Sequence, residues 1–279
     1  MSDASATGTV ADDRDPARSR RGQRRAGLVL VTTGLLALLL TGGIVAALAD
    51  LVLDGGRGIA ADDDAPDAAT SDTAATARTA LATAPMLDLP PAAAAPHALT
   101  TRTAGPPVAL PAAAPGDPLA TRFPATPEGA LAQLAELMRV GMAGGDPAVW
   151  ERTYDAVAEP GAAPAAGTWT GRDLVDLRRG AGMSVSGPPP EGTSISWTPT
   201  AAMVKGTLDG GTYTVACVLG ELVVENRGRV VTAGWGNCLP MHRTGDRWLV
   251  AAGPTAALAP SAWPGSAEAV DAGWREIRR

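Results

Sequence analysis

Hydrophobic and polar positions divide the chain into four regions of different character. Residues 1–25 are polar and charged, and the next residues form a continuous apolar run. Residues 53–118 are rich in alanine, proline, threonine and aspartate, without a sustained period of 3.6 or 2.0 residues. Residues 119–279 carry helical patterns followed by strand patterns. The chain is therefore predicted to contain a tail, an apolar segment, a linker and one folded domain.

The apolar run from Ala26 to Ala49 contains 24 residues and no charged side chain. As a helix it would be about 36 Å long, whereas the hydrocarbon core of a bilayer is about 30 Å thick. We therefore predict a transmembrane helix over residues 26–52 that contacts membrane lipid.

Charged residues on either side of this run predict its orientation. Aspartates follow the run, and six arginines precede it: Arg14, Arg18, Arg20, Arg21, Arg24 and Arg25. The positive-inside rule then places the N-terminus in the cytoplasm and the C-terminal domain outside a cell membrane. An uncleaved signal anchor is favoured. Cleavage after Ala49 and a twin-arginine signal at Arg20-Arg21 are the alternatives.

Aromatic residues mark the start of the folded domain. The single phenylalanine, both tyrosines and all seven tryptophans lie at or beyond Phe123. Residues 1–25 and 53–118 lack such groups, so burial cannot offset the entropy of ordering them. We expect a disordered cytoplasmic tail and a disordered linker there, and one domain over residues 119–279.

Three helices are expected at the start of this domain. Thr126 and Asp146 each precede a proline, which is the pattern of an N-cap followed by the first helical turn. The start of a third helix is predicted at Thr170–Asp173, which resembles a capping box. A further helix is expected after Ser266, with Val270, Trp274 and Ile277 on one side.

The middle of the domain has strand patterns separated by turn residues. Strands are expected over residues 193–208, 212–225, 229–242 and 247–252, with an edge or a bulge at Pro199. Helices followed by an antiparallel meander predict the α+β class, with the helices packed on one face of the sheet.

Cys217 and Cys238 are the only cysteines, and two thiols outside the membrane are expected to form a disulfide. If Arg227-Gly228 is a two-residue turn, Cys217 faces Cys238 at a non-hydrogen-bonded pair of the hairpin. A glycine bulge at this turn is the alternative, and it would shift the register by one residue. We assign the disulfide a structural role because no Cys-x-x-Cys motif is present.

The search for chemistry finds no catalytic motif, metal site or cofactor site. His97 and His242 are far apart in the sequence, and the formal net charge of −6 gives no reason to expect nucleic-acid binding. Trp197 and Trp235 could line a pocket, although core packing is favoured for both. The remaining acids are expected to lie on solvent-exposed faces or to cap helices, and not to act as acid–base groups: Asp155, Glu159, Asp173, Asp176, Glu221 and Glu225.

The order of elements, ending in Gly245-Asp-Arg-Trp-Leu-Val250, resembles NTF2-like domains. An N-terminal anchor, a linker and an extracytoplasmic domain of this kind together resemble VirB8-type and TcpC-type subunits of conjugation and type IV secretion machines, here of actinobacterial mobile elements. The resemblance covers residues 26–52 and 124–252. It implies a curved sheet beneath a helix layer and a subunit without catalytic residues, whereas the long linker and the cysteine pair depart from the usual pattern.

These observations predict a non-enzymatic, membrane-anchored assembly subunit of a conjugation or secretion complex. Its outer domain would bind other envelope proteins or a second copy of itself, and the anchor would raise its effective concentration. Two alternatives stay open. The first is a small-molecule enzyme that uses an NTF2-like pocket, which needs a carboxylate beside a phenol or a second acid. The second is a cell-wall or lipid-binding module with a groove of exposed tryptophans.

Overall fold

The computed structural model of the chain describes residues 66–113, 119 and 122–278. The predicted tail (residues 1–25), the predicted transmembrane helix (residues 26–52) and the first part of the predicted linker lie outside these residues. Among the described residues, no helix is both long enough and apolar enough to cross a membrane.

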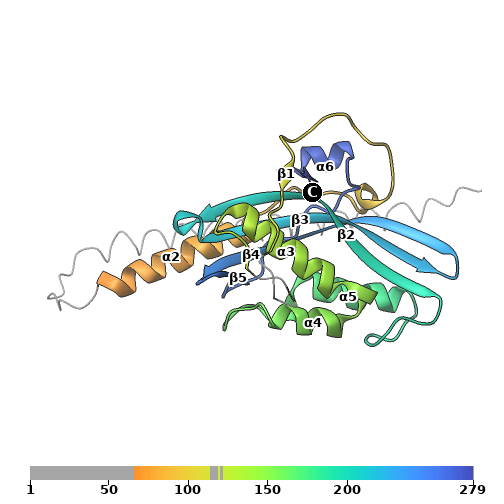
Figure 1. Cartoon of the computed structure of the whole chain (residues 1–279), viewed down its shortest axis with the longest axis horizontal. Coiled ribbons are helices and arrows are strands. Elements are labelled where there is room, and N and C mark those ends of the chain that lie inside the picture. Colours follow the sequence, from red (N-terminus) through yellow and green to blue (C-terminus); the bar gives the residue numbers. More distant parts are fainter. Residues whose placement is uncertain (1–65, 114–118, 120–121, 279) are drawn as a thin grey trace, which may run out of the picture. The chain divides into compact units, whose positions relative to one another are not determined.

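A curled sheet lies at the centre of the described region (Figure 1), and together with the helices it confirms the α+β class. The strand order is β1-β6-β2-β3-β4-β5, with β1 parallel to β6 and the other neighbours antiparallel. The strands are β1 (Val108–Ala109), β2 (Thr193–Leu208), β3 (Tyr213–Asn226), β4 (Arg229–Thr244), β5 (Arg247–Val250) and β6 (Arg275–Arg278).

Three predicted helices share the core on one side of the sheet: α3 (Pro127–Gly141), α4 (Pro147–Asp155) and α5 (Trp169–Gly180). Helix α3 packs directly on the strands, α4 packs on α3, and α5 packs on α4. The side chains of Thr126 and Asp146 accept hydrogen bonds from the first turns of α3 and α4, as expected for N-caps. Helix α5 starts earlier than predicted, because Thr168 rather than Thr170 accepts from the Gly171 amide, at 3.0 Å.

Large side chains fill the space between these helices and the sheet. Many of them are buried, including Leu131, Leu134, Met138, Trp150, Leu174, Trp197 and Trp248. Their burial is the main favourable contribution to the stability of this layer.

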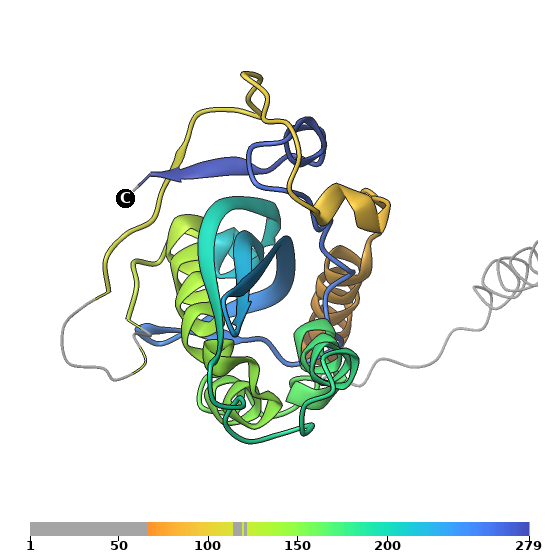
Figure 2. The same ribbon diagram turned by 90° about the vertical axis from the view of Figure 1, so that its right-hand side faces the viewer.

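The opposite face of the sheet carries a covering that the sequence analysis did not predict. Residues 66–113 fell within the predicted disordered linker, but they contain α2 (Pro66–Thr83), a short 3-10 helix η1 (Pro91–Ala94) and β1. Figure 2 shows α2 and α3 on opposite sides of the curled sheet. Short 3-10 turns also occur at η2 (Ala143–Gly145), η3 (Ala165–Gly167) and η4 (Asp209–Gly211).

Small side chains and a few long-range contacts hold this covering in place. Ala82 is fully buried, and Met86 and Leu89 pack against a second core that includes Cys217 and Leu219. The Lys205 ammonium of β2 donates to the carbonyl oxygens of Ala82, at 2.8 Å, and Ala84. A cation at these carbonyls is favourable because they form the negative end of the helix dipole.

The central meander follows the predicted register. Asn226 pairs with Arg229, so Arg227 and Gly228 form a two-residue turn, and both have positive φ as a type I′ turn requires. The alternative glycine bulge at this turn is therefore wrong. The predicted irregularity at Pro199 is confirmed, because the β2–β3 register shifts between Pro199 and Ala201.

The predicted C-terminal helix is wrong beyond its first turns. Helix α6 (Ala267–Asp271) is short, and Gly273 has a φ of 92°, which is incompatible with a continuing right-handed helix. The next residues instead form β6, which pairs with β2 through Ala201 and Ala202 and with β1. Trp274 is still buried, and its indole N–H donates to Pro260 O at 2.9 Å.

Candidate functional site

The predicted disulfide is confirmed. Cys217 and Cys238 are bonded, and their Cα atoms are 4.1 Å apart, the short spacing of a non-hydrogen-bonded pair. Both residues are buried in the second core, where Cys238 Sγ lies 3.5 Å from Met86 Sδ. This buried position fits the structural role assigned from the sequence.

The two tryptophans named as pocket candidates occupy different environments. Trp197 is only 3% exposed, and its indole N–H donates to Trp235 O at 3.2 Å. Its ring lies on Gly220, where a Cβ atom would come within 2.2 Å of it. Trp235 is half-buried near the free edge of β4 and lines a surface groove. The structure therefore places Trp197 in the core and Trp235 at an accessible site.

We call this surface the edge groove, and its volume is about 530 Å³. Helix α5 contributes Trp169, Asp173, Asp176 and Leu177 to one wall. The floor and the other wall come from Ala233, Gly234, Trp235, Pro91, Ala94, Leu258 and Ser261. Four segments that are distant in the sequence thus form one mainly apolar groove with two carboxylates at its rim.

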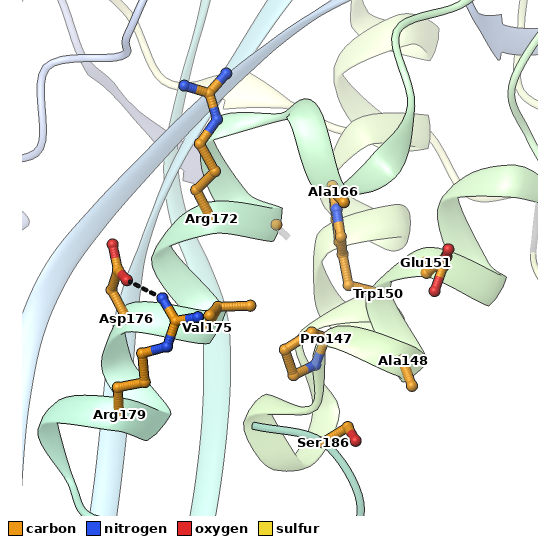
Figure 3. Close-up of a pocket in the computed structure, with 11 residues that line it drawn as sticks. Pro147, Ala148, Trp150, Glu151, Ala166, Arg172, Val175, Asp176, Arg179 and Ser186 are labelled. Carbon is orange, nitrogen blue, oxygen red and sulfur yellow. Dashed lines mark hydrogen bonds and ion pairs between the residues drawn. The ribbon is translucent and has the colours of Figure 1, made fainter. Parts of the chain in front are cut away.

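A second depression, the helical hollow, lies on the other side of α5, between α5 and α4, with a volume of about 600 Å³. Its floor includes Trp150, whose indole N–H donates to Thr168 Oγ1 at 3.1 Å. Val175 extends across the hollow from α5, whereas Arg172 extends away from it (Figure 3). Asp176 belongs to both depressions and forms an exposed ion pair with Arg179, with 3.4 Å between Oδ1 and Nη1.

Packing around α5 fixes the position of both depressions. The Arg172 guanidinium lies 4.8 Å from the centre of the Trp169 ring, and the Trp169 indole N–H donates to Ala256 O at 3.1 Å. Arg178 is fully buried and donates to the carbonyl oxygens of Gly145 (3.1 Å), Ser184 (2.6 Å) and Gly187 (2.8 Å). Sequence reasoning missed Arg178, because nothing in a single sequence distinguishes a buried arginine from a solvent-exposed one at the end of a helix.

The carboxylates in the edge groove do not have the same environment. Burial, followed by the like charge of Asp176, raises the pKa of Asp173 above its ordinary value. No histidine, cysteine or tyrosine lines either depression. Arg172 acts in the opposite sense on the pKa of Asp173, and Arg179 pairs with Asp176, but neither arginine lines the edge groove; within its lining the only charges are the two carboxylates, so the groove favours a positively charged ligand group.

The titratable groups that could serve acid–base chemistry are occupied elsewhere. The phenol groups of Tyr154 and Tyr213 donate to backbone carbonyl oxygens, and burial raises the pKa of each to about 12. His242 lies 2.8 Å from Glu159, which also accepts from Thr244 and from the Ala252 amide. These hydrogen bonds outweigh burial and lower the pKa of Glu159. His242 and Glu159 line neither depression.

In the part of the chain that the structure describes, no three histidine, cysteine or carboxylate side chains gather as a metal site would require. No protein-family model, curated protein or solved structure matches the chain. The candidate site therefore rests on geometry, and it consists of the edge groove and the helical hollow on either side of α5.

Proposed function

We propose that the chain is a non-enzymatic assembly subunit whose outer domain binds partner proteins through the surface around α5. The observation that carries this proposal is the edge groove, where half-buried tryptophans and aliphatic groups lie beside two carboxylates. Apolar surface with aromatic anchors and a charged rim is the usual composition of a protein-binding site. The groove does hold a second acid, Asp176, beside Asp173, but no histidine, cysteine or tyrosine lines it, and its Ser261 hydroxyl accepts a hydrogen bond from the Gly236 amide; this lining favours binding over catalysis.

The proposal also includes the compartment and the family. The disulfide supports an oxidising, extracytoplasmic environment, consistent with a single-pass anchor at residues 26–52 and a cytoplasmic N-terminus. The layered α+β arrangement, with three helices followed by an antiparallel meander, supports an NTF2-like fold. Together with the anchor, it supports a VirB8-type role in a conjugation or secretion complex.

The test is photo-cross-linking with the full chain in cells that contain its natural envelope proteins. A photoreactive amino acid would replace Leu258, in the edge groove, or Val175, in the helical hollow; Leu99, 69% exposed and outside both depressions, is the control position. We expect a specific cross-link to another envelope protein from Leu258 or Val175 and not from Leu99. Absence of any cross-linked protein at both sites would contradict the proposal.

A cell-wall-binding module is the second candidate, because Trp169 and Trp235 lie together in an accessible groove. Aromatic rings in grooves can stack on sugars as well as on protein side chains. Co-sedimentation of the full chain with purified, protein-free cell walls tests this candidate. Binding that is lost in Trp235→Ala and kept in Trp263→Ala, a half-buried tryptophan outside the edge groove, would favour it.

A further inference from the structure

The outer edge of β4 is closed over only part of its length. Strand β5 pairs with β4 from Met241 to Thr244, and the Ala251 amide donates to Pro240 O. Further along, the Gly236 amide donates to the Ser261 hydroxyl at 3.1 Å. From Gly234 back to Val230, no backbone partner outside β3 is present among the described residues. We call this stretch, Val230–Gly234, the open edge of β4; it is exposed at Val230 and Val231, whereas Gly234 at its inner end is buried against the backbone of Ala262.

The hairpin register determines which peptide groups face outward along this edge. Cys217 and Cys238 form a non-hydrogen-bonded pair, and such pairs alternate with hydrogen-bonded pairs along an antiparallel ladder. Val230 and Thr232 share the parity of Cys238, so their N–H and C=O groups point away from β3. Val230 is 60% exposed and Val231 is 67% exposed, so solvent reaches this edge.

The edge groove lies along the inner end of this open edge. Ala233 and Gly234 line it, and helix α5 forms its wall on the helical side of the sheet. Leu258 and Ser261 form the opposite wall and belong to the covering of the other face, in which Ala259 and Ala262 are buried. A groove between the two layers and beside an unpaired strand edge is the geometry at which an extended peptide adds as a further strand.

Natural sheets usually protect an open edge with a lysine, a proline or an inward-pointing charge. Residues 230–235, Val-Val-Thr-Ala-Gly-Trp, contain none of these. The acids in the wall, Asp173 and Asp176, would meet a basic side chain of an incoming strand. In a second copy the nearest base is Arg229, one residue before the open stretch, and residues 230–235 themselves carry none; charge complementarity therefore favours a different protein, with a base within its strand, as the occupant.

We propose that the open edge of β4, Val230–Gly234, binds an extended segment of a partner protein as an additional strand. Alternate apolar side chains of this segment lie in the edge groove, and one lysine or arginine faces Asp173 and Asp176. The main-chain ladder supplies affinity, and the groove supplies specificity. This inference rests on the proposed function and specifies the partner as an apolar, basic β-strand peptide.

The test is a selection from a phage-displayed library of random peptides of about twelve residues against the purified full chain. We expect enrichment of sequences with alternating β-branched or aromatic residues and at least one lysine or arginine. A synthetic copy of the best sequence should bind the full chain. A copy with N-methylated alternate amides, which cannot form the ladder, should lose at least about tenfold in affinity.

Thr232→Pro tests the strand edge from the side of the protein. Its amide points outward, so proline removes a donor from the open edge while the β3 ladder is kept. We expect at least about a tenfold loss of peptide affinity, whereas Thr232→Val, the matched control, should bind within about twofold of the natural chain. Asp173→Asn should lower the affinity for the basic peptide by a larger factor than the affinity for an analogue of that peptide in which lysine is replaced by glutamine.

The outcomes separate this inference from the proposed function. Strand addition is overturned if no peptides are enriched, or if Thr232→Pro binds the peptide as tightly as the natural chain. If Thr232→Pro does not fold, undiminished affinity of the N-methylated peptide overturns strand addition instead. If cross-links from Leu258 or Val175 persist in Thr232→Pro, partner binding stands and only strand addition fails. A concentration-dependent dimer that Thr232→Pro abolishes would identify a second copy as the occupant and would also overturn the proposal.

Discussion

The two faces of the sheet are covered by different kinds of sequence. On the helical face, α3, α4 and α5 bury leucine, methionine and tryptophan side chains. On the opposite face, residues 66–113 and the segment after β5 bury mainly alanine, together with the disulfide and Trp274. The first covering is held by large apolar area. The second has little area per residue, so its attachment depends more on a lysine cap and individual ion pairs, and the disulfide beneath it joins β3 to β4.

The helical face should be the more sensitive to loss of a single large side chain. Trp197→Ala removes a ring that is 3% exposed and leaves a cavity beside Gly220, so we expect a loss of about 3–5 kcal/mol in the free energy of unfolding. Urea denaturation, followed by tryptophan fluorescence, measures this loss.

Half-buried Trp235 is the control for this measurement, and Trp235→Ala should cost at most about 2 kcal/mol. Equal losses for the two variants would show that Trp197 contributes no more than a surface tryptophan. The proposed division of roles between the two residues would then fail.

On the opposite face the largest single contribution should come from the disulfide. Replacing both Cys217 and Cys238 by alanine opens a loop with a sequence separation of 21 residues, and the chain-entropy estimate is a loss of about 3 kcal/mol. The same urea titration measures it. Thiol titration of the denatured, unreduced chain is the companion measurement, and two free thiols would mean that the bond does not form in the natural protein.

The comparison also explains what could be predicted from the sequence. The helices on the helical face were predictable because N-cap residues precede prolines and large apolar residues recur with the helical period. The Cys217–Cys238 register was predictable because the two strands are joined by a two-residue turn. The opposite face gave no such signal, because an alanine contributes little to a hydrophobic period whether it is buried or exposed. Its decisive contacts, Lys205 to Ala82 and Arg78 to Asp209 at 2.6 Å, join residues more than a hundred positions apart.

The candidate site was predictable only in part for the same reason. Trp235 was identified as a pocket candidate together with Trp197, because both are tryptophans on predicted strands. Trp197 is buried because its ring lies over Gly220 in the core between the helices and the sheet, whereas Trp235 lines the edge groove. Trp235 is accessible because β5 pairs with β4 only from Met241 to Thr244, which no local pattern encodes. Trp169 and Asp173 join the groove because α5 packs beside that edge.

A smaller and more local effect is expected from the lysine that caps α2. Lys205→Met leaves the carbonyl oxygens of Ala82 and Ala84 without their charged donor, and we expect a local loss of about 1–2 kcal/mol. Hydrogen exchange should be faster over residues 72–89, whereas exchange in α3 should not change. Lys205→Arg keeps a donor and a charge, so its exchange rate over residues 72–89 should lie between those of the natural chain and of Lys205→Met. If hydrogen exchange in α3 became faster by the same factor in Lys205→Met, the two coverings would unfold together.

The smallest effect is a pH dependence at the ion pair that joins the covering to α6. His97 Nε2 lies 2.9 Å from Glu268 Oε2; this hydrogen bond raises the pKa of His97 above 6.5 and lowers that of Glu268 below 4.5. The histidine contribution is present below pH 6.5 and is lost as the pH rises through the raised pKa, and the glutamate contribution is lost as the pH falls below 4.5.

Limited proteolysis within residues 97–107 should therefore be faster at about pH 8 than at about pH 6. His97→Gln should remove this difference after correction for the pH dependence of the protease. A difference that survives in His97→Gln would assign the pH response to another group, and the covering would then not depend on this ion pair.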